Sequence, residues 1–267
     1  MTPIQHHLGP LWADFQNRYK SVMDSPIPIL NDVNSYNLKN GGKQIRPTLL
    51  LLSAAASGNI HPHLSDLAVA VELLHNASLM HDDVVDQDDE RRGQPSIHKK
   101  WNSPVAILTG DYYLAQVMHL ILSVENPAVC DLLTKTVTAM TEGELIQQAH
   151  LNDAVADTDL YLDIIGRKTA SLMSACCAIG AIAPEKEHSN TNHTTDLFQS
   201  FGMHYGTAFQ LRDDINDYHS EHNSTRPPID TLYTLLKKEI ELGNDIVSLL
   251  PQNQYTTELS TLLIQLQ

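Results

Sequence analysis

Two clusters of aspartates have the residue type and spacing of a cation site. They are Asp82, Asp83 and Asp86 in the stretch HDDVVD, and Asp213, Asp214 and Asp217 in the stretch RDDIND. On a helix the first and last aspartate of each cluster lie one turn apart on the same face, where like charges repel. Divalent cations favour such carboxylate oxygens together with those of a substrate phosphate. One cluster alone is compatible with a solvated helix end, whereas two matched clusters predict a metal-bridged diphosphate site.

An anionic substrate also needs fixed positive charges. Lys43 and Arg46 lie in the stretch GGKQIRP, at the expected start of a helix, where free N–H groups and the helix dipole favour phosphate. For this stretch alone, a glycine turn with two solvated cations stays open as an interpretation. Arg91 and Arg92 follow the first aspartate cluster after a short loop, and arginine makes bidentate phosphate contacts. Lys168 begins another apolar helical run.

Helices are expected to position these residues, because apolar residues recur every three and four positions over most of the chain between Leu64 and Tyr218. The clearest predicted helices are residues 64–86, 105–124, 128–149 and 197–217. No alternating strand pattern flanked by hairpin turns is visible, so a sheet has little support. Two segments, 68–80 and 171–183, are nearly apolar on all sides. They are predicted to lie at the centre of a helical bundle.

The interruptions between helices are short and polar. They fall at residues 25–28, 40–42, 87–95, 184–195, 220–230 and 251–254. None has the length or composition of a linker between domains, and no repeat of fixed period is visible. The pattern therefore favours one all-α domain over residues 1–267.

The composition excludes several classes of protein. The 267 residues carry a formal net charge of −15, which argues against a nucleic-acid partner and an anionic membrane surface. The three cysteines have no disulfide or zinc spacing, so a reducing, cytoplasmic location is expected. The N-terminus lacks the features of a secretory signal. No transmembrane segment is expected, since the longest apolar stretch, 169–183, falls short of the roughly 20 residues that a bilayer needs.

Together these residues resemble the trans-type isoprenyl diphosphate synthases, and most closely the long-chain polyprenyl synthetases. The matching elements, in the order of the family, are GGKQIRP, His75, HDDVVD with RRG, Gly110-Asp111-Tyr112-Tyr113, Gly143-Glu144 with Gln147, Lys168-Thr169-Ala170, and FQLRDD with Asp217. The resemblance implies a helical bundle around a central cavity. It also implies Mg²⁺ as cofactor, an allylic diphosphate and isopentenyl diphosphate as substrates, and a homodimer.

The same resemblance assigns roles to individual residues. The six aspartates of the two clusters would hold Mg²⁺ on the allylic diphosphate, directly or through water, and Asp82, Asp86 and Asp213 would act in catalysis together with Lys168. Contacts to the allylic diphosphate would come from Arg91, Lys168 and Gln210. Contacts to isopentenyl diphosphate would come from Lys43, Arg46, His75 and Arg92. The double bond of isopentenyl diphosphate would attack the allylic carbon as its diphosphate departs, so no protein nucleophile is needed.

The length of the product is expected to depend on what blocks the growing tail. The residues one turn before Asp82 are Ala77 and Ser78, where short-chain members of the family carry aromatic side chains. Two small residues there predict a product longer than farnesyl diphosphate, which replacement of Ala77 with Phe should shorten. Alternatively, the small residues only allow close helix packing, and Leu73, Leu74 or another helix sets the length.

After Tyr218 the sequence departs from the family pattern. Members usually carry a lysine- and glycine-bearing loop that closes over the diphosphate, whereas this chain has a shorter segment with a single arginine, Arg226. A reduced cover would lower activity or admit water. The departure leaves open a partner-dependent subunit of a heteromeric synthase. A terpene cyclase or diphosphate lyase is also open, although it would not need the residues assigned to isopentenyl diphosphate.

Overall fold

The computed structural model describes residues 2–150, 157–182, 191–218 and 226–267, excluding the side chains of residues 191 and 192. Nearly all of this part of the chain is helical, so the all-α prediction is confirmed. Most of the predicted interruptions at 184–195 and 220–230 lie outside the described residues. The predicted interruption 184–195 extends too far toward the C-terminus, because α11 (Thr191–Asn216) already begins at Thr191.

The chain divides into two compact units, which are described separately. The first contains Met1–Thr48 and Pro62–Asn126, and the second contains Leu49–His61 and Pro127–Gln267. A single domain over residues 1–267, with a cavity at its centre, stays a prediction.

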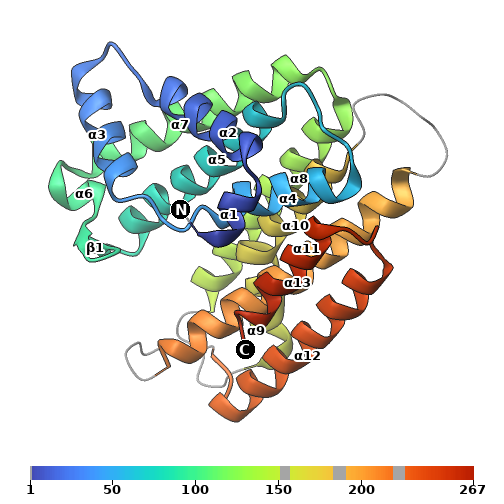
Figure 1. Cartoon of the computed structure of the whole chain (residues 1–267). Helices are drawn as coiled ribbons and strands as arrows, with labels where there is room; N and C mark the ends of the chain where they lie inside the picture. The colour runs from blue at the N-terminus through green and yellow to red at the C-terminus, as the bar shows by residue number, and fades with distance from the viewer. Residues whose placement is uncertain (1, 151–156, 183–190, 219–225) are drawn as a thin grey trace. The chain divides into compact units, whose positions relative to one another are not determined.

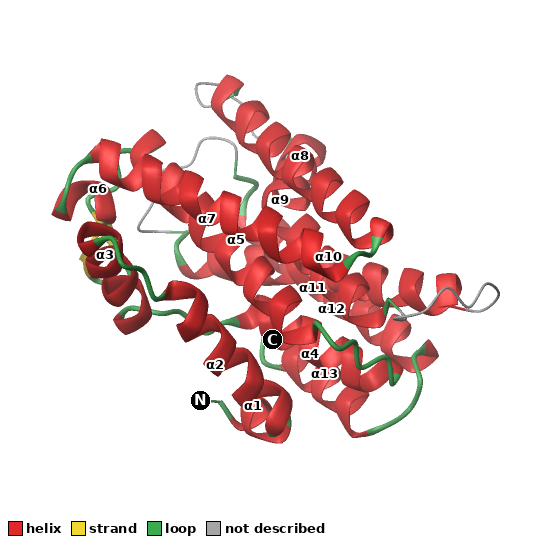
Figure 2. Ribbon diagram, turned by 90° about the horizontal axis from the view of Figure 1, so that it is seen from above, coloured by secondary structure: helices red, strands yellow, loops and turns green. Residues whose placement is uncertain are grey.

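The first unit is built around two long helices. Its helices are α1 (Pro3–His7), α2 (Pro10–Met23), α3 (Pro28–Lys39), α5 (Leu64–Val85), α6 (Ile97–Lys100) and α7 (Ser103–Val124), and it includes the start of α4 (Ile45–Ser57). Helix α5 packs along α7 (Figures 1 and 2). Proline in the first turn starts α1, α2, α3 and α7, where its missing N–H costs nothing. The predicted helices 64–86 and 105–124 are thus confirmed within two residues at each end.

A small β-hairpin is present, although the sequence offers little support for a sheet. Strands β1 (Glu90–Arg91) and β2 (Gln94–Pro95) pair antiparallel within the predicted interruption 87–95. The two residues between them, Arg92 and Gly93, have φ angles of 56° and 72°, as two-residue hairpin turns of type I′ require. Strands of two residues are too short to produce an alternating pattern, so they could not be predicted from periodicity.

The second unit contains the remaining helices. They are α8 (Pro127–Ala149), α9 (Thr158–Ile165), the π-helical turn η1 (Gly166–Ala170), α10 (Ser171–Ala181), α11 (Thr191–Asn216), α12 (Ile229–Leu249) and α13 (Gln254–Ile264). Helix α10 packs along α11, and α11 along α12. Every residue of α10 from Leu172 to Ala181 is buried, which confirms that this segment is central to its unit. Gly202 of α11 allows the close approach, because a Cβ there would lie 2.7 Å from the Met173 carbonyl oxygen.

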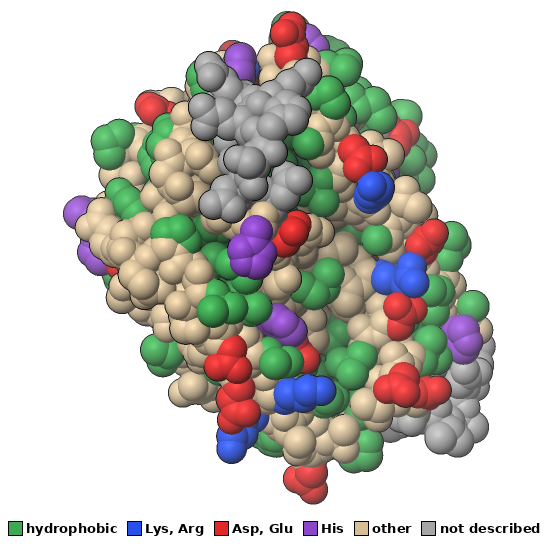
Figure 3. All heavy atoms as spheres, turned by 90° about the vertical axis from the view of Figure 1, so that its right-hand side faces the viewer, with side chains coloured by type: hydrophobic (Ala, Val, Ile, Leu, Met, Phe, Trp, Pro, Cys, Tyr) green, Lys and Arg blue, Asp and Glu red, His purple; other side chains and the backbone are tan. Residues whose placement is uncertain are grey.

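One helix among the described residues, α7, is long and apolar enough to cross a membrane. A helix packed inside a folded protein can meet the same criterion, so this is weak support for a span. On the face shown in Figure 3, acidic and basic side chains are interspersed among apolar and uncharged ones.

Candidate active site

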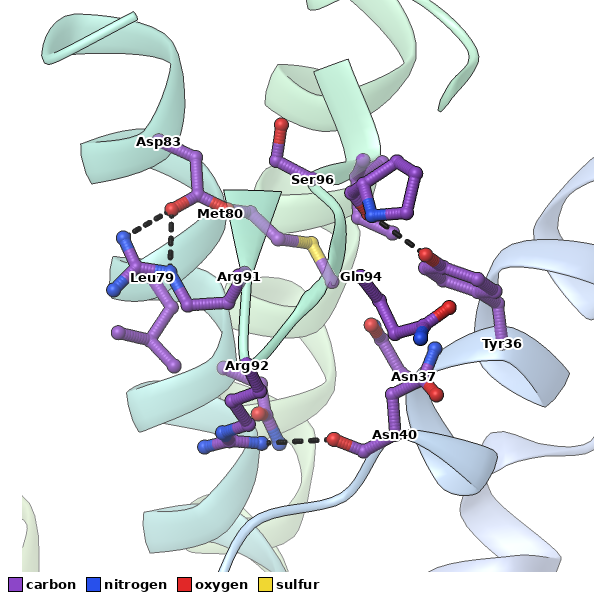
Figure 4. Close-up of a pocket in the computed structure, with 13 residues that line it drawn as sticks. Tyr36, Asn37, Asn40, Leu79, Met80, Asp83, Arg91, Arg92, Gln94 and Ser96 are labelled. Atoms are coloured by element: carbon purple, nitrogen blue, oxygen red, sulfur yellow. Dashed lines mark hydrogen bonds and ion pairs between the residues drawn. The ribbon is translucent and has the colours of Figure 1, made fainter. Parts of the chain in front are cut away.

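The first aspartate cluster ends α5, and its central member differs from its neighbours. Asp83 is 3% exposed, whereas Asp82 is half-buried and Asp86 is exposed. Arg91 of β1 donates through Nε to Asp83 Oδ1 at 2.7 Å, and its Nη2 contacts the same oxygen (Figure 4). Burial nevertheless raises the pKa of the Asp83 carboxyl, because desolvation outweighs the lowering effect of Arg91. Asp83 is therefore a buried anchor, while the outer two carboxylates face the open side of the helix.

The second aspartate cluster, at the end of α11, repeats this arrangement. Asp214 is 8% exposed, and Asp213 and Asp217 are exposed. Two side chains from outside α11 hold Asp214: the Tyr161 hydroxyl donates to Oδ2 at 2.5 Å, and Arg226 Nη2 donates to Oδ1 at 3.1 Å. Burial and the neighbouring carboxylate raise the pKa of Tyr161, so the phenol keeps its proton. Each cluster thus has one anchored and two outer carboxylates.

The donor set of each cluster fits an open divalent-cation site. No three acidic, histidine or cysteine side chains come together as a closed metal site in the described part of the chain. Two outer carboxylates one helical turn apart are what Mg²⁺ commonly uses, since water and substrate phosphate complete its coordination. Asp83 and Asp214 are each hydrogen-bonded by an arginine. Their direct coordination of the metal ion therefore stays a prediction.

Basic residues gather in the first unit around the start of α4 and the β-hairpin. Arg92 is exposed, and its Nη1 donates to the Asn40 carbonyl at 3.2 Å. A Cβ on Gly42 would lie 2.5 Å from Arg92 Nη2, so the glycine lets the guanidinium lie against the backbone of the GGKQIRP stretch. Lys43 is exposed and Arg46 half-buried, directly before and within the first turn of α4. The structure therefore brings Arg46 and Arg92 into one region, near the same two residues of α5, Glu72 and His75. Lys43 lies three residues before Arg46, and the binding of isopentenyl diphosphate by this group stays a prediction.

His75 of α5 lies close to Arg46 and Arg92. Burial, reinforced by Arg46 and Arg92, lowers the pKa of its imidazole well below the usual value. The ring is therefore neutral at pH 7, and offers one N–H donor and one acceptor to a ligand.

Glu72 is a residue that the sequence analysis missed. It lies one turn before His75, is 4% exposed, and faces the positive charges of Arg46 and Arg92. Burial raises the pKa of its carboxyl, and the two arginines oppose that shift. The signal was present in the sequence, because Glu72 is the one charged residue in the apolar segment 68–80.

Lys168 lies on η1 rather than at the start of a helix, so that prediction was wrong. The π-helical turn lies between α9 and α10 without a break, and such turns are frequent at functional sites. Lys168 Nζ pairs with Glu144 Oε2 of α8 at 2.5 Å. Gly143 permits this approach, because a Cβ there would lie 2.8 Å from the Cβ of Arg167. Beside it, the Thr169 hydroxyl donates to Gln210 Oε1 at 2.9 Å and so orients that amide.

A cavity of about 50 Å³ lies beside the first cluster (Figure 4). Helices α3 and α5 and the hairpin line it, with Tyr36, Asn37 and Asn40 on one side and Arg91 and Arg92 on the other. The two arginines diverge from adjacent positions, one toward Asp83 and the other toward Asn40. The hairpin therefore separates two cations that are neighbours in sequence.

The predicted site residues fall into two groups, one in each unit. The group of the first unit is Lys43, Arg46, His75, Ala77, Ser78, Asp82, Asp83, Asp86, Arg91 and Arg92, and that of the second is Lys168, Gln210, Asp213, Asp214 and Asp217. That the two groups face each other across a cavity stays a prediction.

Most of the chain matches a known protein family. Residues 27–231 match the family model for Polyprenyl synthetase. The chain therefore belongs to the polyprenyl synthetase family, as the resemblance indicated.

Curated relatives include enzymes of long-chain synthesis. The decaprenyl-diphosphate synthase of Dictyostelium discoideum is 38% identical over 192 residues, which are 72% of this chain and 41% of that protein. Heptaprenyl diphosphate synthase component 2 of Bacillus subtilis is 33% identical over 217 residues, which are 80% of this chain and 60% of that protein. The chain thus spans less than two thirds of the length of these two relatives.

Solved structures show the same fold. The heptaprenyl diphosphate synthase of Staphylococcus aureus has a TM-score of 0.88 at 24% identity, covering 97% of each chain. A polyprenyl synthase of Caulobacter crescentus, in complex with calcium and isoprenyl diphosphate, has a TM-score of 0.88 at 22% identity, covering 97% of this chain and 95% of that one.

Proposed function

We propose that the protein is a Mg²⁺-dependent prenyltransferase that joins isopentenyl diphosphate to an allylic diphosphate and so lengthens it beyond farnesyl. The observation that carries this proposal is the repeated aspartate arrangement, in which a buried anchor leaves two outer carboxylates at the end of an apolar helix. The basic group around Arg46 and Arg92 supports a second diphosphate site. That group also weighs against a cyclase or lyase, which needs one diphosphate only.

Mg²⁺ would be held by the outer carboxylates Asp82, Asp86, Asp213 and Asp217. When bound, it neutralises charge that accumulates on the departing diphosphate. Arg91, Lys168 and Gln210 would add contacts to the same diphosphate, and Gln210 is already oriented by Thr169. The anchored residues Asp83 and Asp214 would keep the outer carboxylates in place.

The basic group would bind isopentenyl diphosphate through Lys43, Arg46 and Arg92. His75 is neutral, so it would donate one hydrogen bond without adding charge. Binding both substrates orients the double bond toward the allylic carbon, which lowers the entropic part of the barrier. The proton lost at the end would pass to the released diphosphate, since the proposal needs no protein base.

A direct test follows the consumption of isopentenyl diphosphate. Purified protein should incorporate the labelled compound into extractable product when both an allylic primer and Mg²⁺ are present, and should stop when the metal is chelated. Incorporation that needs no primer, or none with geranyl, farnesyl and geranylgeranyl diphosphates in turn, would overturn the proposal.

The product is expected to shorten when Ser78 is replaced with Phe. Ser78 is half-buried and shares its helix face with Asp82, whereas Ala77 is fully buried. Ala77 lies one turn before His81, whose Nε2 lies 3.2 Å from the Ile107 carbonyl oxygen of α7. A phenylalanine at 78 would therefore extend from the face that carries the diphosphate site. Mass spectrometry of dephosphorylated products should show a lower maximum length, and an unchanged distribution would contradict it.

Replacing Ala77 with Phe is also expected to shorten the product, but it should differ from Ser78→Phe in its cost to stability. Because Ala77 has no room around it, the larger ring should overpack the first unit and lower the free energy of unfolding by about 1–3 kcal/mol. Chemical denaturation would measure this loss.

We propose that this chain forms a homodimer. We also propose that it lies in the cytoplasm, where its three free thiols would stay reduced. Helix α7 exposes Ile107, Leu108, Met118 and Leu122. Ile107 and Met118 are close to three turns apart, and Leu108 and Leu122 close to four, so all four lie on one side of the helix. The Bacillus subtilis relative is named component 2 of a heptaprenyl diphosphate synthase, which makes a heteromer the second assembly to test.

Sedimentation should therefore show a dimer of this chain, and Leu122→Glu should shift it to monomer while Ile60→Glu, at another exposed apolar position, does not. A wild-type monomer at micromolar concentration would contradict the homodimer.

A further inference from the structure

Arg226 lies in the segment where the sequence departs from the family pattern, and the proposed function gives it no task. It is 8% exposed, which is unusual for an arginine. Burying a guanidinium costs several kcal/mol unless it is paired and hydrogen-bonded. Its position therefore needs an explanation within the second unit.

The guanidinium of Arg226 makes two kinds of contact at the end of α11. Its Nη2 donates to Asp214 Oδ1 at 3.1 Å, and its Nη1 donates to the Asp217 carbonyl oxygen at 3.4 Å. The first contact balances a buried carboxylate, and the second is to a carbonyl just beyond the last turn of the helix. A cation is also favourable at this end because of the helix dipole. Arg226 thus stabilises an aspartate cluster at a helix end where acidic residues are normally unfavourable.

Both oxygens of the Asp214 carboxylate accept hydrogen bonds. Tyr161 occupies Oδ2, and Arg226 shares Oδ1 with Gln210 Nε2, which lies 3.3 Å away. Gln210 is in turn held by Thr169. The buried Asp214 carboxylate of α11 therefore joins Tyr161 of α9 to Arg226, which precedes α12. Through Gln210 it is also connected to Thr169, the residue that follows Lys168.

We propose that Arg226 is a positioning residue that fixes the Asp214 anchor, so that Asp213 and Asp217 keep the geometry for binding a divalent cation with a diphosphate. This inference rests on the proposed function, because it takes Asp213 and Asp217 as ligands of the divalent cation. It assigns a role to the shortened segment that does not involve covering the substrate. Arg226 acts through Asp214 and touches neither the cation nor the diphosphate.

Binding of inorganic diphosphate in the presence of Mg²⁺, measured by calorimetry, tests the inference without requiring turnover. R226Q should weaken the Mg²⁺-dependent binding of diphosphate by about 10- to 100-fold. Losses of this size are usual when a residue that orients metal ligands is removed. R226K should recover part of it, because an ammonium keeps the charge but not the fork. The matched control is R18Q, which removes an arginine from a pair with Asp66 of the first unit and should bind as the wild type does.

Two further variants keep the test decisive if R226Q does not fold. Tyr161→Phe removes only one donor to Asp214 and should weaken binding in the same direction. In D214N, adding R226Q should cause no further loss, because the two residues act as a unit. Unchanged binding in both R226K and Tyr161→Phe would overturn the inference. Wild-type binding without chain elongation would instead overturn the proposed function and leave the role of Arg226 to be judged by the variants.

Discussion

Asp82→Asn is expected to lower the turnover number at least 100-fold while leaving the fold intact. The side chain at position 82 would lose its negative charge. It would then hold the cation that stabilises the departing diphosphate much less well. A 100-fold loss corresponds to about 2.7 kcal/mol of transition-state stabilisation. Steady-state kinetics at saturating Mg²⁺ would measure it.

The stability of this variant should not fall. Asp82 and Asp86 are acidic residues one turn apart at a helix C-terminus, so removing one charge relieves repulsion. Asp131→Asn is a suitable control, because Asp131 is an exposed carboxylate of α8 paired with Lys135. Its turnover should match that of the wild type. If Asp82→Asn kept more than a tenth of the activity, Asp82 would not be a metal ligand.

Arg91→Met is expected to lower the free energy of unfolding by about 2 kcal/mol. Removing one partner of a fully buried pair commonly costs 3–5 kcal/mol, and we reduce this figure because the Arg91 side chain is 37% exposed and therefore screened. Asp83 is the reason for the loss, since its carboxylate would stay buried without its main partner. Urea denaturation at neutral pH would measure the change.

The double variant R91M/D83N separates this structural role from substrate binding. It should regain most of the lost stability, because no charge is left buried, but it should not regain affinity for the allylic diphosphate. If R91M alone were as stable as the wild type, Asp83 would not be the anchor that the structure indicates.

The helices could be predicted from the sequence because burial imposes a regular period on them. The segments 64–86, 105–124 and 128–149 agree with α5, α7 and α8 within two residues at each end. The two aspartate clusters and their basic neighbours were likewise found by residue type and spacing. Both groups of residues lie at helix ends, where a change of composition makes them visible.

Other parts of the site could not be predicted, since they depend on contacts between residues far apart in sequence. Nothing local shows that Arg226 pairs with Asp214, or that Tyr161 donates to the same carboxylate. The π-helical turn that carries Lys168 arises where Gly143 and Gly206 allow α8 and α11 to come close, and it has no period of its own. Burial distinguishes Asp83 and Asp214 from the outer aspartates. The residue type alone does not, because all six residues are aspartates.

The identity of the product tests most directly whether this chain elongates an allylic diphosphate. Purified protein would be incubated with Mg²⁺, farnesyl diphosphate and isopentenyl diphosphate, and the dephosphorylated products identified by mass spectrometry. Linear alcohols that are longer than farnesol by whole isoprene units are expected. Farnesol alone, or cyclic hydrocarbons formed equally well without isopentenyl diphosphate, would contradict elongation.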